Sequence, residues 1–280
     1  MNKTLFMVIT AIFFTFAVAA NERAELIHIR HTVIPNGLCD KHKISYHIFD
    51  TGVPGPGIVI IAGVHGNEPA GQRAAQHIVD NFDFTKGRFL IVPQSNPVAT
   101  VANTREVDGE NLNRMFPGNQ TGNTAQRIAA AITEVIRSFS PCAIIDLHEA
   151  RLSRTNDADS WANSQDLVNT IVYSRLNENI LDKTREAVNF AINAINDTSL
   201  IDGQRPFRPL GGYGSIGTSH REFSVLFNVP SFITETGRQD PSGGIYNPLE
   251  IREAQQLFLV HALVRFFKDS HCSSPVPPNL

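Results

Sequence analysis

The chain alternates short, mostly apolar runs with longer segments in which apolar residues recur every three or four positions. The short runs are typical of strands buried on both faces of a sheet. They are residues 58–63, 89–93, 142–147 and 231–234. The longer segments predict helices with one apolar side. They are residues 69–81, 125–139, 179–195 and 248–267. Residues 43–49 alternate apolar and polar side chains, which predicts a half-exposed strand.

This order of elements predicts the α/β class. Fully apolar strands that alternate with helices favour a mostly parallel mixed sheet with helices on both faces. In such sheets the active site lies beyond the carboxyl ends of the strands. Polar motifs follow Gly63, Pro93, Leu147 and Thr234, at the expected strand ends, and residues 94–124 are expected to form a long polar loop.

The first twenty residues differ from the rest. Lys3 is followed by an apolar run from Leu5 to Val18 and then by Ala19 and Ala20, a layout that predicts a cleaved secretory signal peptide over 1–20. The alternative is an uncleaved membrane anchor, for which the run is short. We therefore expect an exported, periplasmic or secreted protein with one hydrolase domain over 21–272 and a disordered tail over 273–280.

Composition narrows the classes of function. The 280 residues are 42% hydrophobic and 18% charged, which is ordinary for a globular protein. A net charge of −3 without a basic block argues against nucleic-acid binding. After the first twenty residues the sequence has no apolar run long enough to predict stable insertion in a membrane. Among the three cysteines, Cys142 is expected to be a small core residue, and a Cys39–Cys272 bridge is conceivable in an exported protein.

Candidate metal ligands follow two of the buried strands. His65 and Glu68 come directly after residues 58–63, with Gly66 between them to allow a tight turn, and His148 directly follows the run 142–147. Two imidazoles and one carboxylate would hold a zinc ion and leave one position open for water, as catalytic zinc sites do. A His-x-x-Glu pair by itself is a weak signal.

Two further motifs offer the remaining chemistry. Glu235 follows the strand 231–234, where a carboxylate beside a metal-bound water can take its proton and return it to a leaving amine. In the loop 105–118, Arg105, Asn113 and Arg114 can grip a carboxylate, because a guanidinium matches it with two parallel hydrogen bonds. The alternatives are a turn acid at Glu235 and a surface salt-bridge network in the loop.

Taken in order, these motifs resemble the zinc carboxypeptidase superfamily, including its succinylglutamate desuccinylase/aspartoacylase branch, over residues 58–237. The resemblance implies that His65, Glu68 and His148 bind one Zn²⁺. It implies that Arg105 polarises the scissile carbonyl and that Glu235 is the general base and acid. Asn113 and Arg114 would hold the substrate carboxylate, completing the expected site.

The resemblance also concerns a glycine-rich loop and one departure. Tyr213 begins a loop similar to the one whose tyrosine closes over substrate in the family, and it precedes Glu235 by 22 residues, a spacing similar to that in true carboxypeptidases. Asn111 stands where the family usually has an Asp that accepts a hydrogen bond from a zinc-binding histidine. An amide oxygen can accept the same bond with less charge, so we expect weaker metal binding or replacement of this contact by Glu110.

The sequence therefore favours a zinc-dependent hydrolase that cleaves an amide bond next to a free carboxylate, chiefly a carboxypeptidase acting on short or cell-wall peptides. Ser219, His220 and Arg221 map near the side-chain pocket of carboxypeptidases and suit an acidic terminal residue. One alternative is deacylation of N-acyl amino acids, as in aspartoacylase, and a second is a non-catalytic binding module. The expected partner is a small peptide or N-acyl amino acid; the sequence leaves the oligomeric state open.

Overall fold

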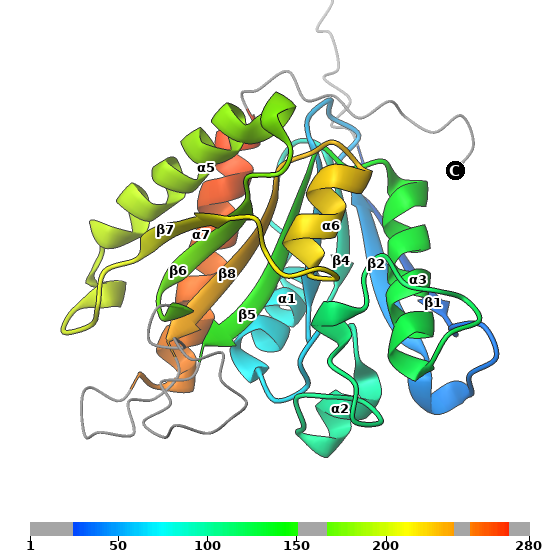
Figure 1. Ribbon diagram of the computed structural model, residues 1–280. Coiled ribbons are helices and arrows are strands. Elements are labelled where there is room, and N and C mark those ends of the chain that lie inside the picture. Colours follow the sequence, from blue (N-terminus) through cyan, green and yellow to red (C-terminus); the bar gives the residue numbers. More distant parts are fainter. Residues whose placement is uncertain (1–24, 151–166, 238–246, 269–280) are drawn as a thin grey trace, which may run out of the picture.

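A computed structural model describes residues 25–150, 167–237 and 247–268, whose strands form one eight-stranded mixed sheet. The strand order is β1-β2-β4-β3-β5-β8-β6-β7 (Figure 1). Four neighbouring strands, β4, β3, β5 and β8, run parallel, whereas β2 and β6 pair antiparallel with the two ends of this group. The strands are β1 Ile27–Val33, β2 Ile44–Asp50, β3 Gly57–Ala62, β4 Arg88–Val92, β5 Ala143–Ala150, β6 Thr170–Ser174, β7 Arg208–Gly212 and β8 Ser231–Gly237.

Helices cover both faces of the sheet. One hydrophobic core lies between the sheet and α1, α5 and α7, and the other between the sheet and α3, with a contribution from α6. The α-helices of the described residues are α1 Pro69–Asp80, α2 Pro97–Ala102, α3 Thr124–Phe139, α5 Glu178–Asn196, α6 Ser219–Leu226 and α7 Leu249–Lys268. Short 3₁₀ turns are η1 Asp40–His42, η2 Leu112–Arg114 and η3 Ser199–Ile201. None of the helices in these ranges is long and apolar enough to cross a membrane.

Alternation along the central strands assigns each side chain to one of the two cores. In β3, Ile58 and Ile60 join the core under α1 and α7, whereas Val59 and Ile61 join the core under α3. Successive side chains of a strand point to opposite faces, so a strand buried on both sides has no polar position until it reaches its end. This is why the uninterrupted apolar runs identify the centre of the sheet.

The predicted α/β class, with its mixed sheet and helices on both faces, is confirmed. The predicted strand 43–49 and the four apolar runs correspond to β2, β3, β4, β5 and β8 within a few residues, and the four predicted helices to α1, α3, α5 and α7. The expected polar loop 94–124 is wrong in part, because it contains α2 and η2. Asn96 caps α2 by accepting a hydrogen bond from the Ala99 amide, a signal present in the sequence.

Strands β1, β6 and β7 and helix α6 have no counterpart among the elements predicted from the sequence. Strands β1 and β7 lie at the two edges of the sheet and are partly exposed, so they lack a continuous apolar run.

The predicted signal peptide and disordered tail fall outside the described residues.

The cysteines differ from the expectation. Cys39 is free and exposed, and Cys142, although buried, takes part in a disulfide. The suggested Cys39–Cys272 bridge is therefore wrong, and Cys142 is more than a small core residue. Spacing along a chain cannot choose among three cysteines, because pairing depends on which ones the fold brings together.

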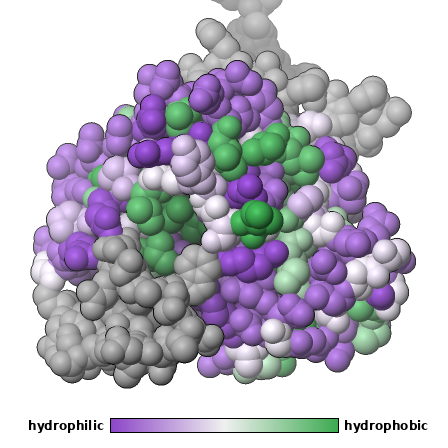
Figure 2. Space-filling view, viewed as in Figure 1, coloured by the Kyte–Doolittle hydropathy of each residue, from purple (hydrophilic) through white to green (hydrophobic). Residues whose placement is uncertain are grey.

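The surface of the face shown in Figure 1 is mostly hydrophilic, with a few hydrophobic patches (Figure 2). One patch lies over α6, where Val225 and Leu226 are exposed, and another lies over the loop that joins β7 to α6. That loop carries the exposed side chains of Tyr213 and Ile216.

A close approach of α1 to β5 generates a prediction about stability. A Cβ atom on Gly71 would lie 2.6 Å from the Leu147 carbonyl oxygen, so α1 must move for any side chain to fit. Ala favours a helix over Gly by about 0.5–1 kcal/mol, whereas overpacking costs about 1–3 kcal/mol. We expect Gly71→Ala to lower the free energy of unfolding, measured by urea denaturation. Gln76→Ala, on the exposed side of α1, should change it by less than about 0.5 kcal/mol and serves as the control.

Candidate metal centre

The predicted metal ligands lie at the carboxyl ends of β3 and β5. His65 stands in the turn after β3, Glu68 is the residue that precedes the first turn of α1, and His148 lies near the end of β5. Gly66 lets this turn lie close against α2, since a Cβ atom there would overlap the backbone of Ala99. The two motifs are brought together because β3 and β5 are parallel neighbours whose carboxyl ends meet at one edge of the sheet.

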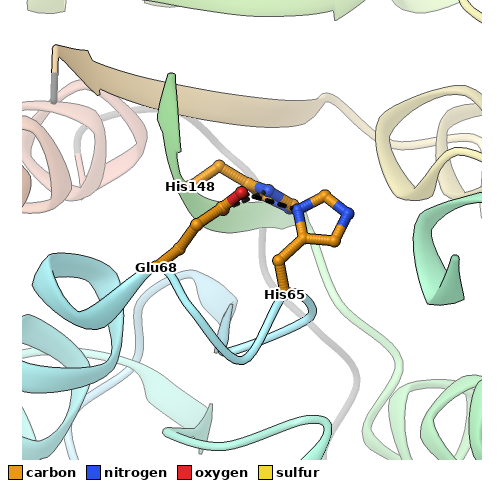
Figure 3. A group of neighbouring side chains, drawn as sticks. All are labelled: His65, Glu68 and His148. Carbon is orange, nitrogen blue, oxygen red and sulfur yellow. Dashed lines mark hydrogen bonds and ion pairs between the residues drawn. The ribbon is translucent and has the colours of Figure 1, made fainter. Parts of the chain in front are cut away.

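The three side chains converge and are buried. Nδ1 of His65 lies 2.8 Å from Oε1 of Glu68, and Nδ1 of His148 lies 2.9 Å from Oε2 of Glu68 (Figure 3). One ligand atom from each residue falls within 4.8 Å of the others. Each residue is at most 3% exposed, so these polar atoms have little access to water as an alternative partner.

The outer nitrogen of each imidazole faces an oxygen. Nε2 of His65 lies 3.1 Å from Oδ1 of Asn111, which also accepts a hydrogen bond from the Asn113 amide. The bond from the backbone amide identifies this atom as the side-chain oxygen, which has no proton to give, so Nε2 of His65 must donate to it. The other ring nitrogen, Nδ1, then carries the lone pair that faces Glu68. Nε2 of His148 lies 3.0 Å from Oδ2 of Asp146. The structure thus places Asn111 in the supporting contact expected for it.

Electrostatics keep the Glu68 carboxylate ionised. Burial alone would raise its pKa, but the neighbouring His65 and His148 lower that pKa well below its ordinary value. Nη1 of Arg105 adds a hydrogen bond to Oε1 at 2.8 Å, and the Glu149 backbone amide donates to Oε2 at 3.1 Å. Burial lowers the pKa of His65; burial acts the same way on His148, but the charges of Asp146 and Glu68 outweigh it and raise the pKa of His148 well above its ordinary value.

This donor set fits a zinc ion. Two imidazole nitrogens and one carboxylate, buried and facing a common point, match the three protein ligands of catalytic zinc sites, in which a fourth position takes water or substrate. An oxygen facing the outer nitrogen of each imidazole completes the pattern usual around such ligands.

Glu235 lies beside this group on the adjacent strand. Its backbone is in register with His148 in the parallel pair of β5 and β8, so both side chains point to the same face of the sheet. Burial raises the pKa of Glu235 to about 8; the charge of His148 opposes this rise and that of Glu68 adds to it. A carboxyl group with a pKa near neutrality can both accept and return a proton.

The three residues expected to contact substrate approach the centre from the loop before α3. Arg105 contacts Glu68, and Asn113 and Arg114 belong to η2. Oδ1 of Asn113 accepts a hydrogen bond from the Ser219 amide at 2.9 Å, which joins η2 to the start of α6. Burial and then the neighbouring charge of Arg105 lower the pKa of Arg114 to about 10, a sign of two cations close together.

The glycine-rich loop packs against this turn. The Phe116 amide donates to the Gly217 carbonyl oxygen at 3.1 Å, and Gly217 has a φ of +80°. A Cβ atom there would overlap the backbone of Arg114, so both contact and conformation require glycine. The side chain of Tyr213, at the start of the loop, is 71% exposed. Its expected closure over substrate stays a prediction.

Two side chains at the start of α6 complete the surroundings. Oγ of Ser219 donates to Oδ2 of Asp146 at 2.5 Å, so that Asp146 links α6 to His148. His220 is 4% exposed, and neither of its ring nitrogens has a hydrogen-bond partner within the described part of the chain. Burial and the charges of His148 and Arg114 lower its pKa to about 3. The role of Ser219 toward Asp146 had no signal in the sequence, because the two residues meet only in the fold.

Known proteins resemble the chain in sequence over about two fifths of its length. Residues 54–165 match the model of the succinylglutamate desuccinylase/aspartoacylase catalytic domain. An N-alpha-acetyl-L-2,4-diaminobutyric acid deacetylase of Halomonas elongata is 36% identical over 114 residues, which are 39% of this chain and 32% of that protein. The matching segment thus spans about a third of the length of this curated relative.

Solved structures resemble the whole fold at lower identity. A succinylglutamate desuccinylase of Silicibacter sp. TM1040 has a TM-score of 0.63 and 19% identity, covering 86% of this chain and 67% of that one. The D,L-carboxypeptidase Csd4 of Helicobacter pylori has a TM-score of 0.59 and 18% identity, covering 76% and 51%. At these identities the likeness concerns the fold alone.

The resemblance seen in the motifs is therefore confirmed from two directions. The family model covers His65, Glu68 and His148 along with the loop that carries Arg105, Asn113 and Arg114. Glu235 lies beyond the matched segment and is placed beside it by the fold. The chain has the zinc carboxypeptidase-like fold and carries in residues 54–165 the signature of the succinylglutamate desuccinylase/aspartoacylase catalytic domain.

Proposed function

We propose that the protein is a zinc-dependent hydrolase that removes an acyl group from the amino nitrogen of an N-acyl amino acid. The observation that carries this proposal is the buried group of His65, Glu68 and His148, with Glu235 in register beside it, in a chain that matches a deacylase family model. The curated relative, a deacetylase of an N-acetyl amino acid, supports the same class of substrate.

One zinc ion, held by His65, Glu68 and His148, would polarise the scissile carbonyl and lower the pKa of a nearby water. The residues of the chain divide the remaining work. Arg114 and Asn113 bind the carboxylate of the amino acid, and the resemblance assigns to Arg105 the carbonyl oxygen of the acyl group. Glu235 takes the proton of the attacking water and returns it to the departing amine.

The comparisons support deacylation better than the carboxypeptidase activity that the sequence analysis favoured. The sequence match is to the deacylase branch, whereas the likeness to carboxypeptidases is one of fold at 14–18% identity. Carboxypeptidase activity remains the second candidate because Tyr213 precedes Glu235 by 22 residues, a spacing similar to that in true carboxypeptidases. Both reactions cleave an amide next to a carboxylate and use the same residues.

The substrate side chain is expected to contact the start of α6. His220 is buried beside Arg114, and Arg221 follows it, so polar or acidic groups are favoured over large apolar ones. We also propose that the protein is exported from the cytoplasm. The charged residue, apolar run and small residues over 1–20 support this proposal.

The substrate class can be tested with a panel. We expect N-acetyl and N-succinyl amino acids to be hydrolysed with a kcat/KM at least tenfold above that of dipeptides with the same terminal residue. Release of free amine is measured with and without a chelator, which should remove activity that Zn²⁺ then restores. A clear preference for peptides would replace the deacylase assignment with the carboxypeptidase one.

Glu235 is tested by Glu235→Gln. The amide keeps the shape of the side chain but cannot accept a proton, so we expect kcat to fall by at least 10²-fold. Bound zinc, measured by atomic absorption, should stay at the wild-type ratio because Glu235 is not a ligand. Near-full activity of this variant would contradict the assignment.

Arg114 is tested by Arg114→Met together with a substrate whose carboxylate is replaced by a carboxamide. A charged hydrogen bond contributes about 1.5–3 kcal/mol, so we expect kcat/KM for the carboxylate substrate to fall by about 10- to 100-fold. The variant should act on the carboxamide about as well as the wild type does. An equal loss on both substrates would indicate a general structural role instead.

A further inference from the structure

Glu68 occupies a position at which a helix normally uses the side chain. It is the N-cap residue of α1, followed by Pro69 at the first helical position. N-cap side chains usually accept a hydrogen bond from a backbone amide of the first turn, because those amides have no partner inside the helix. Glu68 makes no such bond, since its carboxylate faces His65, His148 and Arg105 instead.

The first-turn amide that Glu68 does not cap is bonded to another side chain. The Ala70 amide, at the second helical position, donates to Oε1 of Glu149. Glu149 belongs to β5, 79 residues further along the chain. A carboxylate is also the favoured group at a helix N-terminus, where the aligned peptide dipoles leave a positive potential. Glu149 thus supplies the cap that Glu68 does not.

Alternation along β5 explains how His148 can face Glu68 while the next residue, Glu149, caps α1. The side chain of His148 points toward Glu68 on one face of the sheet, and that of Glu149 points to the opposite face, toward α1 and α7. The Glu149 amide meanwhile donates to Oε2 of Glu68 at 3.1 Å. Glu149 therefore caps the first turn of α1 with its side chain and holds the Glu68 carboxylate with its backbone amide.

A buried counter-ion accompanies Glu149. Nη1 of Arg252, on α7, donates to Oε2 of Glu149, and Nε of Arg252 donates to the Asn247 carbonyl oxygen at 3.0 Å. Glu149 and Arg252 are 3% and 6% exposed. A carboxylate buried this deeply without a cation would be strongly destabilising, so Arg252 is what permits Glu149 to lie there.

We propose that Glu149, with Arg252 as its counter-ion, is a positioning residue that caps α1 in place of Glu68 and so leaves the Glu68 carboxylate available to a metal ion. This inference rests on the proposed function, because it assumes that His65, Glu68 and His148 hold the metal. Without an acceptor from β5, the Ala70 amide competes for the carboxylate of Glu68, the N-cap residue of the same helix. Metal affinity then falls.

Two double variants that differ in one acceptor oxygen test the proposal. Glu149→Met/Arg252→Met removes both buried charges and the acceptor, whereas Glu149→Gln/Arg252→Met removes the charges but keeps an oxygen for the Ala70 amide. We expect the Met/Met variant to bind Co²⁺ about 10- to 100-fold more weakly than the wild type, with an altered visible spectrum of the bound ion. The Gln/Met variant should bind within about threefold of the wild type.

A control separates capping from general loss of stability. Asn123 caps α3 by accepting a hydrogen bond from the Gln126 amide, so Asn123→Ala removes a cap from another helix. It should lower the melting temperature without changing Co²⁺ affinity. If the Met/Met variant does not fold, Glu149→Asp replaces it: the shorter side chain keeps its charge for Arg252 but withdraws from Ala70, and Co²⁺ affinity should fall.

The proposal is overturned if the folded Met/Met variant, or Glu149→Asp in its place, binds Co²⁺ as tightly as the wild type with the same spectrum. It is also overturned if the Gln/Met variant loses as much affinity as the Met/Met variant. Co²⁺ binding is measured without substrate. A wild-type protein that binds the ion but hydrolyses no N-acyl amino acid would therefore refute the proposed function and leave the role of Glu149 standing.

Discussion

The structure around the candidate metal centre depends on one buried carboxylate, that of Glu68. An ionised group at 3% exposure must have every oxygen satisfied, and here two imidazoles, a guanidinium and a backbone amide supply the partners. These partners come from the turn after β3, from β5 and from the loop before α3. Each of these segments is therefore held in place by the need to neutralise the same charge.

The parallel centre of the sheet makes this convergence possible. Because β3, β5 and β8 are neighbours running in one direction, the residues that follow their apolar runs meet at one edge. His148 and Glu235 are in register there, which places the proposed proton acceptor next to a candidate metal ligand on the neighbouring strand. The supporting residues arrive from the helices: Gln256 of α7 donates to the His148 carbonyl oxygen at 2.7 Å.

Further side chains surround the three candidate metal ligands and hold the two imidazoles in orientation. Asn111 and Asp146 face the outer nitrogens of the two imidazoles, and Ser219 joins Asp146 to α6. An amide at position 111 keeps the hydrogen bond to His65 while carrying no charge. In the proposed metal site, the binding energy of the ion would then depend more heavily on Glu68 and on the residues that hold Glu68 in position.

The sequence by itself determined the central strands, four of the helices and the three candidate metal ligands. Runs such as 58–63 are apolar at every position because both faces of the strand are buried, and the chemistry of His65, Glu68 and His148 is a property of the side chains. It could not reveal β1 and β7, whose edge positions leave them partly exposed, or the pairing of Cys142. Only the tertiary structure decided the partners of these residues, such as Glu149 with Ala70 and Arg252. Those contacts join segments 79 and 103 residues apart, and no local pattern records which distant group will neutralise a buried charge.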